Sequence, residues 1–224
     1  MTAMALNLTV ATVSLSCVVL TAVAMFAPLM GGGMDPKVWF GWHPVLMTLA
    51  FPCLMTLGRW SYLTGDSRPL TSQRALHGIL MGLGSLAMLL GYLAIFEAHL
   101  PQSKFFAYDF KAGAWSPDWK RVVHVYLGYA LIVAVLAQAF MGARKLQVLG
   151  TGQRVLTFHG SLGKAVILLA CFNIIIAIRF WGWSTPMKVC LYALTIAAGV
   201  FGALWPRPSK ASEGEDASLF AGPA

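Results

Sequence analysis

The sequence predicts an all-α membrane protein with six transmembrane helices. Hydrophobic residues fill 58% of the 224 positions and charged residues only 11%, and the mean hydropathy is +0.71. A soluble domain of this size does not need so much apolar sequence. The apolar residues also fall into six runs, each near the length of about 20 residues that a helix needs to cross a bilayer.

The six predicted spans account for nearly the whole chain. The first is interpreted as a helix rather than a signal peptide, because it lacks a basic N-terminal region and is longer than a signal peptide's apolar segment. We expect the spans to cover residues 7–29, 40–63, 72–98, 119–141, 154–179 and 187–205. Residues 1–205 are thus predicted to form one transmembrane domain. Residues 206–224, which are rich in Pro, Ser, Gly and acidic side chains, are expected to be a disordered tail.

The charge distribution predicts an orientation. The net charge is +8, and the Lys and Arg residues stand at helix ends and in loops. Cations placed there set membrane orientation and contact anionic lipid, so they do not indicate nucleic acid as a partner. Nine of the sixteen fall on the side of the N-terminus, including most of the arginines, which favours cytoplasmic N- and C-termini. The longest loop, 99–118, lies on the opposite side and is rich in aromatic residues.

Four histidines lie inside predicted spans, near their starts: His43, His77, His124 and His159. Ionisable side chains at membrane depth are costly and usually functional. Because successive spans run in opposite directions, His43 should lie at the depth of His124, and His77 at the depth of His159. The separations within these pairs, 81 and 82 residues, are nearly equal. The sequence therefore predicts two histidine pairs, one near each membrane face, in a central bundle of the second to fifth helices.

Two histidines at each depth indicate two b-type haems, held by the central bundle. Zinc requires three or four ligands, often with Cys or carboxylate among them, and no Asp or Glu stands beside these histidines. The four cysteines have no metal-site spacing, and the sequence contains no C-x-x-C-H motif for covalent haem attachment. A haem with two axial imidazoles has no open position for oxygen, so electron transfer is the expected chemistry. No glycine-rich dinucleotide fingerprint or P-loop indicates a flavin or nicotinamide module.

Small residues recur along the histidine faces. Gly128 and Gly163 follow His124 and His159 by four residues, and Gly84 and Gly91 follow His77 at intervals of seven. Small residues serve close helix packing or leave room for a flat macrocycle. With the histidines present we favour the second role.

The segment Phe40-Gly-Trp-His43-Pro-Val-Leu-Met47 resembles the second-helix signature of the eukaryotic cytochrome b561 family. Its members are six-helix, ascorbate-dependent oxidoreductases with two haems, usually homodimers. The resemblance implies that His43 and His124 hold the non-cytoplasmic haem and that His77 and His159 hold the cytoplasmic one. It also places a glutamine at Gln138, which should approach the cytoplasmic haem or form an interhelical hydrogen bond.

The resemblance implies substrate residues at both faces. Cytoplasmic ascorbate, an anion, would bind basic residues around the start of the third helix, namely Arg74 with Arg68 and Arg154. On the other face His99 corresponds to a histidine that contacts substrate, monodehydroascorbate or a ferric chelate. Arg74 and His99 are thus the candidate catalytic residues.

This chain departs from the family around His124. It reads Arg121-Val-Val-His-Val-Tyr126 where many members read S-L-H-S-W. The missing serine and tryptophan leave the haem propionates without assigned partners. Lys120, Arg121 and Tyr126 are the candidate substitutes, because a propionate pairs with a cation or a hydroxyl.

The predicted function is electron transfer from cytoplasmic ascorbate across an endomembrane vesicle or plasma membrane. The alternatives are a quinol-linked di-haem cytochrome, a subunit that needs a partner reductase, and a metal or proton transporter with a histidine relay. Glu97, near a span end, is the only carboxylate within the predicted spans. The scarcity of intramembrane carboxylates counts against the transporter.

Overall fold

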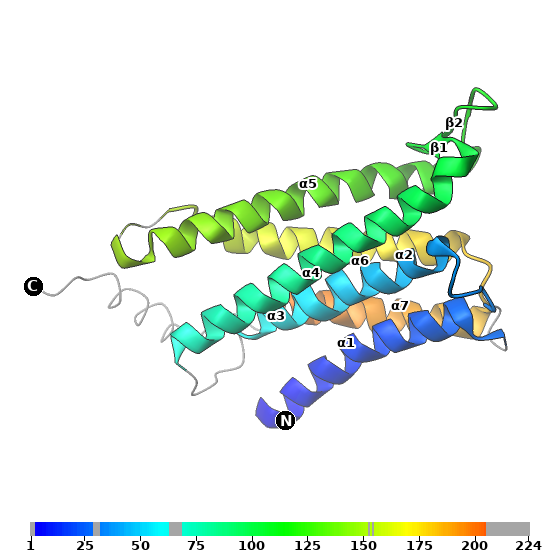
Figure 1. Cartoon of the computed structure of the whole chain (residues 1–224). Helices are drawn as coiled ribbons and strands as arrows, with labels where there is room; N and C mark the ends of the chain where they lie inside the picture. Colours follow the sequence, from blue (N-terminus) through cyan, green and yellow to red (C-terminus); the bar gives the residue numbers. More distant parts are fainter. Residues whose placement is uncertain (1–2, 29–31, 63–68, 152, 154, 205–224) are drawn as a thin grey trace, which may run out of the picture.

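The computed structural model describes residues 3–28, 32–62, 69–151, 153 and 155–204. Within these residues six helical segments are long and apolar enough to cross a membrane, which confirms the predicted all-α, six-span fold. They run alongside one another in a bundle, with a small group of strands beyond one end (Figure 1). The predicted disorder of residues 206–224 concerns a segment outside the described residues.

The helices begin and end as follows: α1 Ala3–Phe26, α2 Trp39–Thr48, the π-helix η2 Leu49–Met55, α3 Thr56–Trp60, α4 Leu70–His99, the 3-10 turn η3 Leu100–Gln102, α5 Trp119–Gln147, the 3-10 turn η4 Leu149–Thr151, α6 His159–Phe180, α7 Thr185–Gly199 and the π-helix η5 Val200–Leu204. The second span joins α2, η2 and α3. Its π-helical stretch contains Pro52, which cannot donate the i→i−4 hydrogen bond and crowds the preceding carbonyl.

The start of α6 differs from the prediction by more residues than the start of any other span does. The apolar pattern predicted a span from residue 154, whereas α6 begins at His159. Leu156 has a left-handed backbone with φ 52°, and the His159 N–H donates to the Leu156 carbonyl, so the chain turns before the helix begins. His159 is therefore the first residue of its helix rather than a turn inside it.

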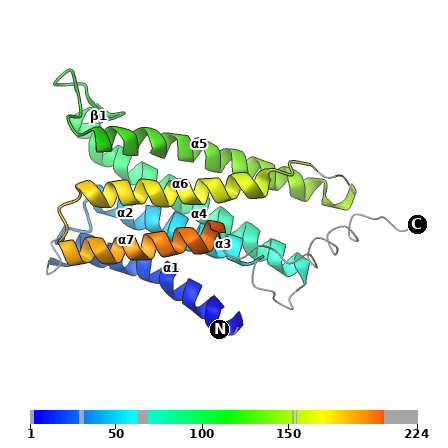
Figure 2. The ribbon, with the colours of Figure 1, turned by 180° about the vertical axis from the view of Figure 1, so that it is seen from behind.

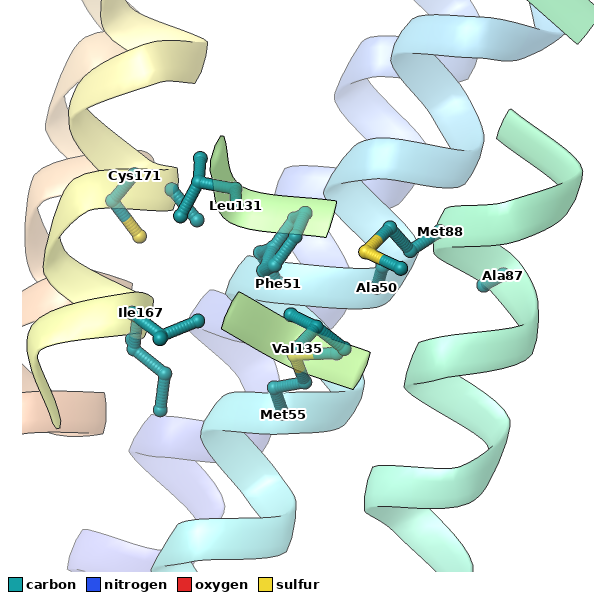
Figure 3. Packing of buried hydrophobic residues seen from close by; sticks show 11 residues of the cluster. Ala50, Phe51, Met55, Ala87, Met88, Leu131, Val135, Ile167 and Cys171 are labelled. Atoms are coloured by element: carbon teal, nitrogen blue, oxygen red, sulfur yellow. The ribbon is translucent and has the colours of Figure 1, made fainter. Parts of the chain in front are cut away.

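The central bundle consists of two helix pairs, α2 with α4 and α5 with α6, while α1 and α7 pack together at the flank (Figure 2). A buried cluster that includes Phe51, Met88, Leu131 and Ile167 fills the middle of the bundle (Figure 3). On each of the four central spans the cluster residues lie, in sequence, between the histidine and the far end of the span.

Glycines permit the closest helix contacts. A Cβ at Gly91 would lie 3.1 Å from Leu46 Cβ, and a Cβ at Gly84 would lie 3.0 Å from Met55 Cγ. These glycines therefore serve the packing of α4 against the second span, which corrects the expectation that they leave room for a macrocycle. Gly128 fits that expectation better, because it lines a cavity described below.

The loop 99–118 contains a three-stranded antiparallel meander, β1 Lys104–Phe105, β2 Tyr108–Asp109 and β3 Ala114–Trp115. Phe106 and Ala107, which join β1 and β2, both have positive φ, as a two-residue type I′ hairpin turn requires. Asp109 accepts hydrogen bonds from the backbone N–H groups of Lys111 and Ala112 and forms an ion pair with Lys104 at 3.5 Å. The sequence predicted the aromatic character of this loop but not the strands.

Candidate haem sites

The four membrane histidines lie in two pairs. The ring centres of His43 on α2 and His124 on α5 are 6.2 Å apart, with the planes at 87°. The ring centres of His77 on α4 and His159 on α6 are 6.4 Å apart, at 79°. The pairing by depth that the sequence predicted is therefore present in the structure.

The spacing within each pair fits one metal ion between two imidazoles. A metal bound to imidazole lies about 2.0–2.1 Å from the ring nitrogen, so two rings on opposite sides of one ion have centres about 6.3 Å apart. Among the described residues no three His, Cys, Asp or Glu side chains gather as a zinc site requires. Two ligands on one axis suit a haem, whose porphyrin supplies the other four nitrogens.

Three of the histidines donate Nδ1–H to a backbone carbonyl. His43 donates to Gly91 O at 2.9 Å, and His77 donates to Gly58 O at 2.9 Å. His124 donates to Asn173 O at 3.2 Å. A carbonyl can only accept, so Nδ1 carries the proton and Nε2 is left with a lone pair for a metal. Such hydrogen bonds orient a ligand ring and raise its basicity.

The acceptors occupy a repeated place in the helices. Gly91 follows His77 by fourteen residues, Asn173 follows His159 by fourteen, and Gly58 follows His43 by fifteen. Between the second span and α4, each therefore supplies the carbonyl for the histidine of the other, and between α5 and α6, α6 supplies the carbonyl for His124. The same spacing gives the separation of the two levels, because fourteen residues of α-helix rise about 21 Å.

His159 is the exception. Its Nδ1 is buried and has no hydrogen-bond partner in the part of the chain that the structure describes. Gln138, fourteen residues after His124, instead donates from Nε2 to the backbone carbonyl of His159 at 3.1 Å. Gln138 thus lies at the His77–His159 pair and forms the interhelical hydrogen bond that was one of its two predicted roles.

A cavity of about 590 Å³ surrounds the His43–His124 pair. Ligand sites commonly enclose about 300–1,000 Å³ and are mostly apolar. Phe51, Met88 and Leu131 line its inner part, and the meander lines the opposite end. The cavity thus runs from the apolar centre of the bundle to the loop side.

His99 lines the same cavity. Its Nδ1 donates to the Ile95 carbonyl at 2.9 Å, which leaves Nε2 available, and its ring packs edge-on against Phe40 at 5.8 Å. The structure therefore brings this candidate catalytic residue to the chamber of the His43–His124 pair.

The opposite end is described only in part. Arg74 is half-buried on α4, one turn before His77. Arg68 and Arg154, the other predicted ascorbate ligands, lie outside the described residues. Sequence reasoning did not assign Tyr62 a role, yet its ring centre lies 5.0 Å from that of His77. The position of Tyr62 at the end of the second span was the only feature of the sequence that could have indicated a place near His77.

The fold and the paired histidines define a class: membrane-embedded haem oxidoreductases that transfer electrons. A sequence model of eukaryotic cytochrome b561 matches residues 42–185, from the second span into the start of α7. The chain belongs to the eukaryotic cytochrome b561 family, and the protein is accordingly a haem b oxidoreductase of transmembrane electron transfer. No curated protein and no solved structure matches the chain.

Proposed function

We propose that the protein takes electrons from cytoplasmic ascorbate and delivers them to monodehydroascorbate or a ferric chelate on the other side of the membrane. The observation that supports this most is the presence of two histidine pairs at opposite levels of one bundle, each spaced for a single metal. One site alone would serve one face, whereas two sites about 21 Å apart serve both.

In this proposal each histidine pair holds one haem b, giving two per chain. Bound there, the haem supplies reversible one-electron chemistry. The protein's part is to hold the imidazoles of His43, His77 and His124 in one orientation each, through the carbonyls of Gly91, Gly58 and Asn173. Gln138 secures the backbone of His159 by its own hydrogen bond. The apolar cluster between the two levels keeps water out of the centre of the bundle.

At the cytoplasmic face, Arg74 attracts and orients the ascorbate anion, together with Arg68 and Arg154. Its place one turn before His77 supports this role, since the cation then stands beside the site that receives the electron. Tyr62, whose ring centre lies 5.0 Å from that of His77, packs beside the same site.

At the opposite face, His99 contacts the acceptor. Its Nε2 ligates the metal of a chelate or, when protonated, gives monodehydroascorbate the proton that accompanies the electron. The Phe40 ring fixes the orientation of His99 within the cavity.

The wider assignment follows the family. Residues 1–205 act as one transmembrane domain, both termini are cytoplasmic, and the chain works as a homodimer in an endomembrane vesicle or the plasma membrane. The excess of cations on the side of the N-terminus supports the orientation.

The first test is spectroscopic. The protein is purified in quinone-free detergent, and reduced-minus-oxidised spectra are recorded with ascorbate and with dithionite, alongside the haem-to-protein ratio. We expect two b-type haems per chain, largely reduced by ascorbate. Haem that dithionite reduces but ascorbate does not would indicate a quinol donor or a partner reductase. Folded protein without haem would favour the metal or proton transporter with a histidine relay.

A further inference from the structure

Arg121 is one of two Lys or Arg residues, among those described, that line the cavity around the His43–His124 pair, which we call the outer cavity. It lies on the first turn of α5, three residues before His124, and its side chain lines the cavity. Its guanidinium lies over the Phe180 ring at 5.3 Å, and that ring packs edge-on against His124 at 5.6 Å. Arg121 is therefore held in a stack that ends on the histidine pair.

Its neighbours are engaged elsewhere. Lys120 Nζ forms an ion pair with Asp118 at 3.4 Å and lies over Trp119. Tyr126 is exposed and packs against Trp115. Lys104 also lines the cavity, but it forms an ion pair with Asp109. Within the described part of the chain, the Arg121 guanidinium has no carboxylate partner, so its charge is available to a bound group.

A second observation indicates an acceptor in the same cavity. Trp183 is 7% exposed and lines the cavity, and its buried Nε1 has no hydrogen-bond partner within the described residues. An unpaired buried donor costs free energy unless a ligand satisfies it. Two residues of the cavity wall thus carry donors suited to a carboxylate: Arg121, whose guanidinium has no carboxylate partner among the described residues, and Trp183, whose indole N–H has no acceptor among them.

We propose that Arg121, assisted by Trp183 Nε1, binds a carboxylate in the outer cavity. The assignment rests on the proposed function. The carboxylate belongs either to a haem propionate or to a diffusible anionic acceptor such as a ferric carboxylate chelate. If the carboxylate is a haem propionate, Arg121 takes the place of the serine and tryptophan that the sequence lacks around His124.

The test compares Arg121→Gln and Arg121→Lys with Arg179→Gln. Arg179 is an exposed arginine near the outer end of α6 that is not among the described residues lining the cavity, so it controls for loss of one positive charge. The readouts are the haem-to-protein ratio, the reduced-minus-oxidised spectrum, and KM for ferric citrate and for the cationic acceptor hexaammineruthenium(III).

Two results support the proposal and distinguish the source of the carboxylate. If Arg121→Gln lowers the haem-to-protein ratio or shifts the spectrum, while Arg121→Lys stays near wild type, the carboxylate is the haem's own. If haem content and spectrum are unchanged and KM rises roughly tenfold for ferric citrate alone, the carboxylate is that of the acceptor.

If the Arg121→Gln variant behaves like the Arg179→Gln variant in every readout, Arg121 does not bind a carboxylate in the outer cavity, and the proposal is wrong. If Arg121→Gln yields no folded protein, Trp183→Phe, which removes the Nε1 donor and keeps an aromatic ring, is measured in the same way, and wild-type behaviour in every readout then overturns the proposal. Failure of the proposed function looks different, because wild-type protein itself would then lack haem or resist reduction by ascorbate.

Discussion

At the scale of single residues, the orientation of the histidine rings depends on hydrogen bonds to backbone carbonyls. Such carbonyls cannot be recognised from a sequence motif. Gly91 has two roles. Its carbonyl accepts a hydrogen bond from His43, and its lack of a Cβ lets α4 approach Leu46 and Met47 closely. Changing the glycine should therefore disturb both the helix contact and the ligand.

Gly91→Ala is expected to lower the free energy of unfolding by about 1–3 kcal/mol, because the new methyl group overpacks the contact with the second span. It should also reduce haem content, since the carbonyl that orients His43 moves. Thermal unfolding in detergent and the haem-to-protein ratio measure the two effects.

Gly82→Ala is the matched control on the same helix, because a Cβ there meets nothing within 4 Å. It should be neutral or slightly stabilising, since alanine is the better helix former. Equal behaviour of the two variants would contradict the role given to Gly91.

Arg74→Gln is expected to raise KM for ascorbate roughly tenfold, because a charge-assisted contact to the anion is lost. Reduction by dithionite and the haem-to-protein ratio should stay at wild-type values, since Arg74 is not a haem ligand in this account. Unchanged kinetics with ascorbate would remove Arg74 from the donor site.

At the scale of elements, the meander is the part of the fold that closes the outer cavity. Asp109 stabilises its second turn by accepting hydrogen bonds from Ala112 and Lys111, and these bonds, with the charge of Lys104, lower the pKa of its carboxyl group. A carboxyl group whose pKa is lower in the folded state stabilises that state at pH values above its unfolded pKa, and the contribution is lost as the pH falls through the folded pKa.

The meander should accordingly lose protection as the pH is lowered below about 4, the ordinary range of an aspartate. Hydrogen exchange of residues 104–115, compared between pH 7 and pH 3 after correction for the intrinsic rate, measures this. Asp109→Asn should already show the reduced protection at pH 7. A variant with wild-type protection at pH 7 would show that the turn does not depend on the carboxylate.

At the scale of the whole molecule, the histidine pairs could be predicted because they depend only on the direction of each helix. The contacts that depend on the register between neighbouring helices could not be predicted from the sequence. Six apolar runs and alternating direction suffice to pair His43 with His124 and His77 with His159. The carbonyl partners of the histidines depend on how far α4 is shifted along the second span. No pattern within the sequence of a single helix gives that shift. The same limit explains Gly84 and Gly91, whose packing role needs the neighbouring helix to be known.

Local features of the sequence explain why the start of α6 was predicted wrongly and why Tyr62 was not assigned a role. Apolar residues continue before His159, so periodicity places the helix too early, whereas the left-handed backbone at Leu156 ends that pattern in the structure. Tyr62 stands at the end of its span, where a single aromatic residue is equally typical of an interfacial anchor.

The central claim is that two histidine sites together carry electrons across the membrane, and sealed proteoliposomes test it most directly. Ascorbate is trapped inside, excess ascorbate is removed, and reduction of external ferricyanide is followed in vesicles with wild-type protein, His43→Ala or His77→Ala. We expect rapid reduction with wild-type protein and near-background rates with either variant, each holding about half the wild-type haem. Background rates with fully haem-loaded wild-type protein in sealed vesicles would contradict it.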